Sequence, residues 1–347
     1  MKHVSYISKK KLGDMMANIR EIAKRAGIGI ATVSRYFNDS GYVSEESREK
    51  IRKAVEELDY TPNALARAIF KKNTKIIGLM IPNITNPFFN QMVSEMEKLF
   101  RKQNYTIILC NTDDDKEKEQ FHIETLRSYR VAGIVAMRTM TPESYRNIDI
   151  PVVAFENQIS PEHITVASDN FKGGMAAFKH LYDGGCRKIL HIQGPEVFIA
   201  TTERLRGFIE ASKKKKDALV DVVKLETDFH IKSLEPAIEN IKNITDYDGI
   251  FVFNDISAAV VMKHLHDLGV RIPEQTQIIG FDNSFLGELL LPSLTTIDQP
   301  IKQLGKITTD LMIRLINGEE IDQKEYYLKT TVIKRSSTLG KIATSKE

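Results

Sequence analysis

The sequence has few cysteines and no long apolar run, and both absences narrow what the chain can be. Its two cysteines, Cys110 and Cys186, cannot form a disulfide framework or a metal site, and each borders an apolar run as buried thiols do. No run of about 18 apolar residues is present, so we expect no membrane span. The first residues lack the apolar core of a signal peptide. We therefore expect a protein of the reducing cytoplasm.

The motifs of common enzyme classes are also missing. The chain has no P-loop, no G-x-S-x-G, no H-E-x-x-H and no G-x-G-x-x-G. An acidic triplet at residues 113–115 precedes a helical pattern, and we interpret it as a helix cap rather than a metal site. The histidines show no ligand spacing. We expect neither an enzyme nor a bound cofactor or metal.

Charge is distributed unevenly along the chain. Residues 1–72 contain 15 Lys and Arg against 9 Asp and Glu, a net charge of +6, whereas the remainder has a net charge of −3. A basic N-terminal part on a mildly acidic body favours binding of a polyanion. A separate lysine run at residues 213–216 ends a helical pattern, and we interpret it as a solvated surface.

Three helical patterns lie close together in the basic part. Asn18 begins the first with a capping-box-like start, and Gly27 ends it. A second, short pattern covers residues 30–37, and Ser44 is the expected cap of a third. Two helices joined by a tight glycine-containing turn are typical of a helix-turn-helix unit, in which the second helix contacts base edges.

The outward face of the second pattern carries side chains suited to DNA. With Val33 and Phe37 turned inward, the outward residues are Ile30, Ala31, Thr32, Ser34 and Arg35. Apolar side chains can contact thymine methyl groups, Arg can bind guanine O6 and N7, and hydroxyl groups suit phosphates. The alternative is that these are ordinary exposed helix residues, because helix-turn-helix spacing is degenerate.

From residue 75 onward, β-rich runs alternate with helical patterns. The runs are 76–81, 105–110, 132–137, 151–155, 164–168, 188–192, 222–225, 249–253 and 277–281. Alternating strands and helices predict an α/β fold with doubly wound parallel sheets. Because the strands are too many for one small sheet, we expect two lobes with a cleft between them, and ligands at the carboxyl ends of the strands.

Polar and aromatic residues recur at those strand ends. Asn86, Phe88 and Phe89 supply an amide and two rings, which together suit a sugar, although a helix start with core aromatics is the alternative. Further polar residues at or opposite strand ends are Glu156, Asn157, Arg206, Asn254, Asp255, Asp282 and Gln299. We interpret Asp255 as the cap of the following helix.

The segment NIREIAKRAGIGIATVSRYFNDSGYVSEESREKIRKAVEELDYTPNALARAI resembles the DNA-binding head of the LacI/GalR family of bacterial transcription regulators. Its TVSR, VSEESREK and YTPNALARA motifs follow the family order and spacing, and the resemblance continues to about Ser337. The ribose- and sucrose-repressor-like subgroup is the most similar. The resemblance implies a helix-turn-helix head, a hinge helix and a two-lobed core of the periplasmic-sugar-binding-protein type.

The resemblance also implies which residues contact DNA. It assigns Ile30 and Ala31 to the main specificity positions and Arg35 to a third base contact. The full expected set is Ile30, Ala31, Thr32, Ser34, Arg35, Tyr42, Asn63, Ala66, Arg67 and Ile69. Two residues depart from the family pattern: Gly29 replaces a Ser or Thr cap, and Ile69 replaces the leucine that wedges into the minor groove.

For the effector, the resemblance points to the cleft between the lobes. The expected contacts are Asn86, Phe88, Phe89, Arg206, Phe229, Asn254, Asp282 and Gln299, with Glu156 added at the rim. Ribose-type members have Asp-Arg where this chain has Glu156-Asn157, so a guanidinium is missing and ribose is in doubt. We expect a small sugar, while a purine, a phosphosugar or a disaccharide stays open, as inducer or corepressor. A sugar-binding protein without DNA function would leave the basic head without a use.

These observations predict a domain plan. Residues 1–16 would be an extension upstream of the natural start, 17–61 the helix-turn-helix domain, 62–74 the hinge helix and linker, and 75–340 the core. Within the core, lobe 1 would comprise about 75–166 and 299–326, and lobe 2 about 167–298 and 327–340. We expect a cytoplasmic homodimer on a pseudo-palindromic operator, controlled by a small sugar. A phosphocarrier co-partner, known among relatives, has no signal here, and the tail lacks leucine heptads for tetramerisation.

Overall fold

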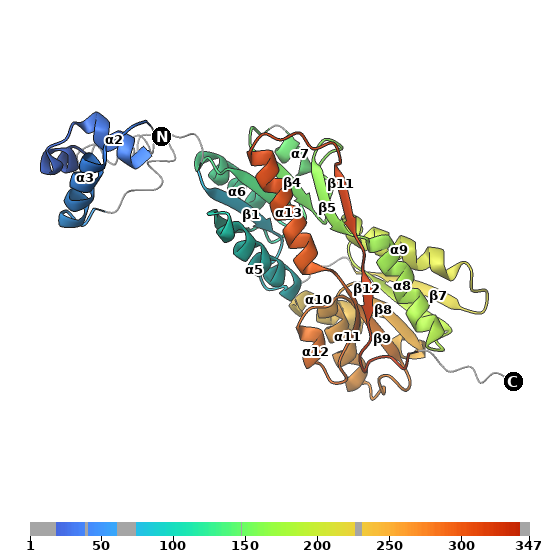
Figure 1. Cartoon of the computed structure of the whole chain (residues 1–347). Helices are drawn as coiled ribbons and strands as arrows, with labels where there is room; N and C mark the ends of the chain where they lie inside the picture. The colour runs from blue at the N-terminus through green and yellow to red at the C-terminus, as the bar shows by residue number, and fades with distance from the viewer. Residues whose placement is uncertain (1–18, 39–40, 61–73, 147, 226–230, 341–347) are drawn as a thin grey trace. The chain divides into compact units, whose positions relative to one another are not determined.

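The computed structural model describes residues 19–38, 41–60, 74–146, 148–225 and 231–340 (Figure 1). The chain divides into two compact units, the first ending at Lys75 and the second beginning at Ile76. The boundary coincides with the place where the sequence pattern changes from helices alone to alternating strands and helices.

The described part of the first unit consists of helices around a small apolar core. Residues 19–26 are helical, and α2 (Ile30–Asn38) and α3 (Glu45–Glu57) follow. The buried core residues are Ile22, Ala23, Val33, Ile51 and Ala54. Gly27 follows the first helix with a φ of 66°, and Ser44 caps α3 by accepting a hydrogen bond from the Ser47 amide. The helix-turn-helix element order predicted from the sequence is confirmed.

The first lobe of the second unit is a six-stranded parallel sheet with helices on both faces. Its elements are β1 (Ile76–Ile81), α5 (Pro87–Lys102), β2 (Thr106–Asn111), α6 (Lys116–Ser128), β3 (Gly133–Met137), α7 (Pro142–Arg146), β4 (Val152–Phe155), β5 (Ile164–Ser168), α13 (Ile301–Ile316) and β11 (Glu325–Leu328). The strand order is β11-β5-β4-β3-β1-β2. Both faces of the inner strands are buried, which explains their continuous apolar sequences.

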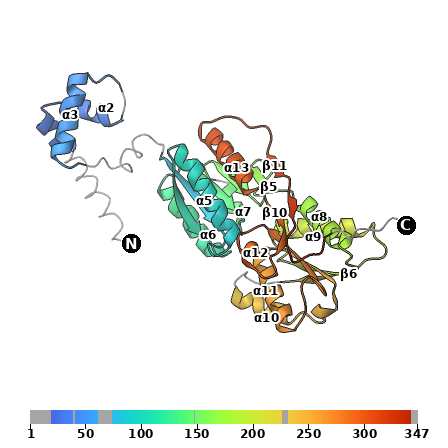
Figure 2. The same ribbon diagram turned by 60° about the horizontal axis from the view of Figure 1, so that its bottom comes forward.

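The second lobe repeats this plan. Its elements are α8 (Asn170–Asp183), β6 (Lys188–Gln193), α9 (Ile199–Ser212), β7 (Leu219–Lys224), α10 (Ile231–Glu239), the 3-10 helix η1 (Ile244–Asp246), β8 (Gly249–Val252), α11 (Asp255–Asp267), β9 (Gln277–Asp282), α12 (Leu286–Leu289), β10 (Thr295–Asp298) and β12 (Thr331–Ile333). The strand order is β12-β10-β9-β8-β6-β7, and only β12 pairs antiparallel in the described sheet. Figure 2 shows α8 and α9 on one face of this sheet and α10 and α11 on the other.

The chain passes between the two lobes three times. It leaves the first lobe after β5, returns to it after β10 through Gln299, and leaves again between β11 and β12. The sequence predicts that residues from about 327 onward belong to the second lobe, but β11 pairs with β5 in the first sheet as far as Tyr327 with Ala167 and Leu328 with Ser168. The last crossing therefore lies at residues 329–330, because parallel pairing along the β5 edge holds the chain in the first lobe until Leu328.

Two glycines let α8 and α9 pack with their backbones in close contact. A Cβ atom on Gly174 would lie 2.0 Å from the carbonyl oxygen of Arg204, and one on Gly207 would lie 1.9 Å from that of Phe171. No side chain fits at either position without moving a helix. This packing fixes the position of α9, and with it the Arg204 side chain that reaches the region between the lobes.

The cysteines and the lysine run lie where the sequence predicts. Cys110 and Cys186 are buried free thiols, as predicted. The lysine run at residues 213–216 is exposed after the end of α9, also as predicted. No helix within the described ranges combines the length and apolar character needed to span a bilayer.

A buried histidine in the second lobe makes the free energy of unfolding depend on pH. His191 in β6 is fully buried, donates from Nδ1 to the Phe251 carbonyl at 3.1 Å, and stacks on the Phe251 ring with a centroid distance of 4.5 Å. Burial lowers the pKa of His191 to about 3. In the unfolded chain His191 takes up a proton below its ordinary pKa of about 6.5, whereas in the folded chain it does so only near pH 3.

We expect His191 to contribute stability that is present above pH 6.5 and is lost as the pH falls towards 3. The free energy of unfolding should fall by about 1.4 kcal/mol per pH unit from this group below pH 6.5. Urea denaturation of the wild type and of His191→Leu at pH 7, 6 and 5 checks this, because the variant lacks the proton uptake and should show the shallower slope. Equal slopes in the two proteins would contradict the assignment.

Candidate functional site

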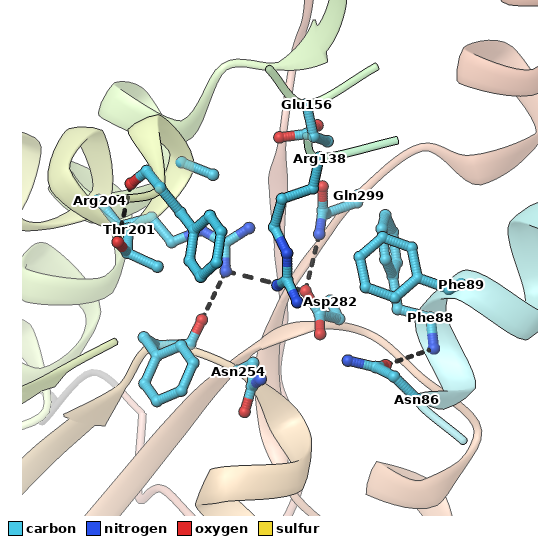
Figure 3. Close-up of a pocket in the computed structure, with 13 residues that line it drawn as sticks. Asn86, Phe88, Phe89, Arg138, Glu156, Thr201, Arg204, Asn254, Asp282 and Gln299 are labelled. Carbon is cyan, nitrogen blue, oxygen red and sulfur yellow. Dashed lines mark hydrogen bonds and ion pairs between the residues drawn. The ribbon is translucent and has the colours of Figure 1, made fainter. Parts of the chain in front are cut away.

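A cavity lies between the two lobes at the carboxyl ends of their strands (Figure 3). Its lining comes from both lobes and comprises Asn86, Phe88, Phe89, Arg138, Glu156, Phe198, Ala200, Thr201, Arg204, Phe253, Asn254, Asp282 and Gln299. Its volume is about 60 Å³. One water needs only about 10–15 Å³, whereas pockets for drug-sized molecules span about 300–1,000 Å³. The cavity therefore has room for more than one water but is smaller than a pocket for a drug-sized molecule.

Asp282 is at the centre of a buried polar network. It ends β9 with a φ of 117°, an unusual backbone conformation for a residue with a side chain. Its Oδ1 accepts a hydrogen bond from Gln299 Nε2 at 2.7 Å, and Gln299 Oε1 accepts one from Ser168 Oγ at 2.7 Å. Gln299 and Ser168 flank two of the lobe crossings. The network therefore connects the cavity to two of the segments that cross between the lobes.

Arg204 supplies a positive charge beside this carboxylate. The guanidinium lies 3.9 Å from Asp282 Oδ1, donates to Asn170 Oδ1 at 2.8 Å and to the Phe253 carbonyl at 2.5 Å, and packs over the Phe281 ring. Burial lowers the pKa of Arg204 and raises the pKa of Asp282 to about 8, while their mutual attraction opposes both shifts. Hydroxyl groups of a bound molecule would find both a strong donor and a strong acceptor here.

The opposite wall is aromatic and belongs to the start of α5. Phe88 and Phe89 are buried and lie edge to face, with ring centroids 5.3 Å apart. Asn86 caps the helix by accepting a hydrogen bond from the Phe88 amide at 2.9 Å. Both interpretations of this segment are therefore correct at once, because the residues begin a helix and also line the cavity.

Two charged residues that line the cavity, Arg204 and Arg138, were not predicted from the sequence. Arg138 comes from the first lobe. It follows β3 with a φ of 53°, and its Nε donates to Asp114 Oδ1 at 2.9 Å while a second nitrogen pairs with Asp114 Oδ2. Its guanidinium lies over the Phe198 ring, 4.2 Å from the centroid, and 5.6 Å from that of Phe89. The rule that polar residues follow strands, already applied at Glu156, also holds for Arg138 and could have found it.

Arg206, predicted as an effector contact, does not line the cavity. Its side chain is exposed, pairs with Glu203 and lies over the Phe171 ring. Arg204, two residues earlier, lines the cavity in its place. Two residues along a helix correspond to a rotation of about 200°, so these two side chains lie on opposite faces of α9.

The remaining predicted effector residues fall into two groups. Asn86, Phe88, Phe89, Glu156, Asn254, Asp282 and Gln299 line the cavity together, whereas Phe229 lies outside the described residues. The Glu156 carboxylate accepts hydrogen bonds from the Ser168 amide at 2.5 Å and from Asn170 Nδ2 at 2.8 Å. These hydrogen bonds hold the segment at Ser168 and Asn170, where the chain first crosses from one lobe to the other. The Glu156 carboxylate also faces Arg204.

The helix after β8 corrects one assignment. Asn254, and not Asp255, is the cap of α11, because its Oδ1 accepts a hydrogen bond from the Ser257 amide at 2.8 Å. Asp255 is buried in the first turn and accepts hydrogen bonds from the Ser284 amide at 2.7 Å and from Thr296 Oγ1 at 2.6 Å. Burial raises the pKa of Asp255 to about 6. It connects α11 to the loop after β9 and to β10.

The first unit presents the predicted DNA-contacting face of α2 to solvent. Val33 is fully buried, whereas Ile30 is 47% exposed, Ala31 and Arg35 are exposed, and Thr32 and Ser34 are half-buried. Tyr42, in the segment between α2 and α3, is 87% exposed. Four further predicted residues, Asn63, Ala66, Arg67 and Ile69, lie outside the described residues.

The acidic triplet is a set of structural carboxylates. Asp115 caps α6 by accepting a hydrogen bond from the Lys118 amide, as predicted, while Asp114 pairs with Arg138 and Asp113 pairs with Lys118. Among the described residues, no cluster of three or more His, Cys, Asp or Glu side chains could hold a metal ion.

Comparison with known families and proteins agrees with both halves of this architecture. Residues 18–63 match the model of bacterial regulatory proteins of the lacI family, and residues 178–338 match a periplasmic binding protein-like domain. The ribose operon repressor of Halalkalibacterium halodurans is 38% identical over 327 residues, which cover 94% of this chain and 98% of the relative.

Solved structures give the same result. A periplasmic binding protein/LacI transcriptional regulator from Alkaliphilus metalliredigens QYMF, in complex with D-xylulofuranose, is 55% identical with a TM-score of 0.74, covering 77% of this chain and all of that one. The lac repressor dimer bound to operator shares the fold, with 22% identity and a TM-score of 0.80 over 92% of this chain and 98% of that one. Together with its helix-turn-helix head and two-lobed core, these matches establish that the chain belongs to the LacI family of bacterial regulatory proteins.

Proposed function

We propose that this chain is a sugar-responsive transcriptional repressor of sugar-utilisation genes. It binds operator DNA through the outward face of α2 and a small neutral sugar in the cavity between the lobes. The observation that carries the proposal is the buried Asp282–Gln299–Arg204 network opposite Phe88 and Phe89, because it provides donors, acceptors and apolar faces in one small cavity. The chain's similarity to repressors of ribose and sucrose operons supports it.

The charges around the cavity favour a neutral effector over a phosphorylated one. Arg138 is paired with Asp114, and Arg204 faces both Asp282 and Glu156. A phosphate group would bring one to two further negative charges beside these carboxylates. Since both guanidinium groups already face carboxylates, a polyol that exchanges hydrogen bonds with them fits better. The small cavity volume likewise favours one ring over a disaccharide.

A five-carbon ketose is the first candidate effector. The Alkaliphilus metalliredigens relative, 55% identical to this chain over its core, was solved with D-xylulofuranose. We propose that D-xylulose, or a pentose of similar size, occupies the cavity here. The effector would bind and leave unchanged, so the chain would not act as an enzyme.

For regulation, we propose a homodimer on a pseudo-palindromic operator. The proposed hinge segment is residues 62–74, of which 62–73 lie outside the described residues, and it would contact the minor groove through Asn63, Ala66, Arg67 and Ile69. Effector binding would change how the lobes close and, through the crossings at Ser168 and Gln299, the spacing of the two heads. Coupling of this kind is reciprocal, so operator binding must change sugar affinity by the same factor.

A thermal-denaturation screen of the full chain tests the effector class. D-xylulose, D-ribose, sugar phosphates and purines would be added at increasing concentration. At about 100 times its dissociation constant, a ligand should add roughly 2.7 kcal/mol to the free energy of unfolding. We expect stabilisation by a neutral pentose or pentulose. Stabilisation only by purines or phosphorylated sugars would overturn the proposed effector class.

On the DNA side, we expect Arg35→Ala to lose discrimination at one base pair of each half-site by about 1–3 kcal/mol. The exposed Arg35 guanidinium would otherwise bind guanine O6 and N7. Binding of the wild type and the variant to a set of single-base operator substitutions measures this loss. A variant that weakens equally on every sequence would show that Arg35 contacts only the phosphates.

A further inference from the structure

The cavity contains a second guanidinium besides that of Arg204, and it comes from the first lobe. Arg138 lies at the carboxyl end of β3, beside β4, whose own end carries Glu156 and Asn157. Figure 3 shows its side chain extending through the middle of the cavity, between the Arg204 wall and the Phe88–Phe89 wall, towards Asp282. Its side chain is only 15% exposed. A charge in such a position must have a partner or a purpose beyond solubility.

The position of the guanidinium is fixed from both lobes. On the first lobe, Asp114 holds it through two hydrogen bonds, and Asp114 is itself only 16% exposed. On the second lobe, the Phe198 ring packs against its face at 4.2 Å. The planar group therefore spans the space between the lobes without a flexible end. A guanidinium fixed in this way can form directed hydrogen bonds with little further loss of conformational freedom.

The end of β4, which carries Glu156 and Asn157, supplies no guanidinium group to the cavity. Glu156 uses its carboxylate to hold Ser168 and Asn170, and Asn157 lines a separate groove together with Arg206 and Phe171. The only cationic side chains among the residues that line the cavity are therefore Arg138 and Arg204. Arg204 approaches Asp282 from the second lobe, whereas Arg138 approaches from the first.

We propose that Arg138 is a specificity-determining residue of the effector site, which donates hydrogen bonds to sugar hydroxyl groups from the first lobe while Phe198 of the second lobe packs on its face. Asp114 acts as the positioning residue for this guanidinium. This inference rests on the proposed function, since it assigns a contact within the same cavity. It also gives the first lobe a polar contact with the sugar that the Glu156-Asn157 pair does not provide.

The test is isothermal titration of the full chain with D-xylulose and with its epimer D-ribulose. Arg138→Gln should weaken D-xylulose binding by about 10- to 100-fold, because a hydrogen bond from a charged donor is lost. It should also change the ratio of the two affinities. Arg138→Lys keeps the charge but loses the planar group, and we expect an intermediate loss. Asp114→Asn, outside the cavity, should weaken both sugars several-fold.

Arg130→Lys is the matched control. Arg130 also follows an element of the first lobe with a positive φ of 51°, but it is exposed and does not line the cavity. The Arg130→Lys variant should bind both sugars with the wild-type affinities. A purely structural role for Arg138 would lower the melting temperature of the variants while leaving the affinities and their ratio unchanged, and that result would overturn the inference.

The experiment also separates this inference from the proposed function. If the wild type binds a sugar and Arg138→Gln binds each epimer as tightly as the wild type does, the inference fails and the proposed function stands. If the wild type binds neither D-xylulose nor D-ribulose nor any other neutral sugar, the proposed function fails and the inference fails with it.

Discussion

Asp282→Asn is expected to produce a repressor that binds its operator but no longer responds to sugar. The substitution replaces the carboxyl group that faces Arg204 with a neutral amide, whose oxygen can still accept the hydrogen bond from Gln299 but which offers a sugar hydroxyl one acceptor oxygen fewer. A hydrogen bond from a sugar hydroxyl group to a charged acceptor contributes about 1.5–3 kcal/mol to binding. We expect sugar affinity to fall by up to about 100-fold, measured by isothermal titration. Operator affinity without sugar should stay within a few-fold of the wild type.

Asp298→Asn is the control for this prediction. Asp298 lies beside Asp282 in the register of β9 and β10, but it is half-buried, accepts a hydrogen bond from Asn283 and does not line the cavity. It should bind sugar with nearly the wild-type affinity. If both variants lost sugar binding equally, the loss would reflect damage to the second sheet rather than a contact with the effector. If Asp282→Asn bound sugar normally, the cavity would not be the effector site.

Val33→Asp is expected to abolish operator binding while leaving sugar binding intact. Val33 is fully buried in the core of the first unit, where the main cluster among the described residues comprises five buried apolar residues. A domain this small has little stability to spare, and an unpaired carboxylate in its core costs several kcal/mol. We expect the head to unfold and operator affinity to fall by at least about 100-fold, measured by fluorescence anisotropy with labelled DNA.

Leu58→Asp adds the same charge to the head at an exposed position after α3. It should change operator affinity by less than about tenfold, since only long-range repulsion from phosphate is added. Titration with sugar reports on the second unit in both variants. Loss of sugar binding in Val33→Asp would contradict the division of the chain into separately folded units.

Much of the fold could be predicted because each element has a strong local pattern. The run IIGLMI became β1 with the predicted bounds, and the cap at Ser44 starts α3. Strand β7 begins at Leu219, three residues before the predicted run, because its pairing with β6 extends the strand through less apolar residues. The final strands were less visible, since β11 and β12 are short and β12 is held mainly by antiparallel pairing with β10.

The candidate site was predicted in its composition but not in its detail. Strand ends were identified correctly, and they carry Asn86, Asp282 and Gln299 into one cavity. The helical residue was misplaced by two positions, because the choice between Arg204 and Arg206 depends on how α9 packs against α8 through Gly174 and Gly207. That packing is a tertiary property. Arg138 was not predicted, because the family resemblance implies an arginine at the adjacent strand end, where this chain has Asn157.

The central claim is that occupancy of the interlobe cavity changes DNA affinity, and one measurement tests it directly. The full chain would select its operator from a pool of random duplexes, and anisotropy would then give operator affinity with and without saturating D-xylulose, or the neutral sugar that stabilises the protein most. The account predicts a change of about 5- to 150-fold, with an equal change in sugar affinity when operator is saturating. A sugar that binds the cavity without altering operator affinity, or a chain that selects no sequence, would contradict it.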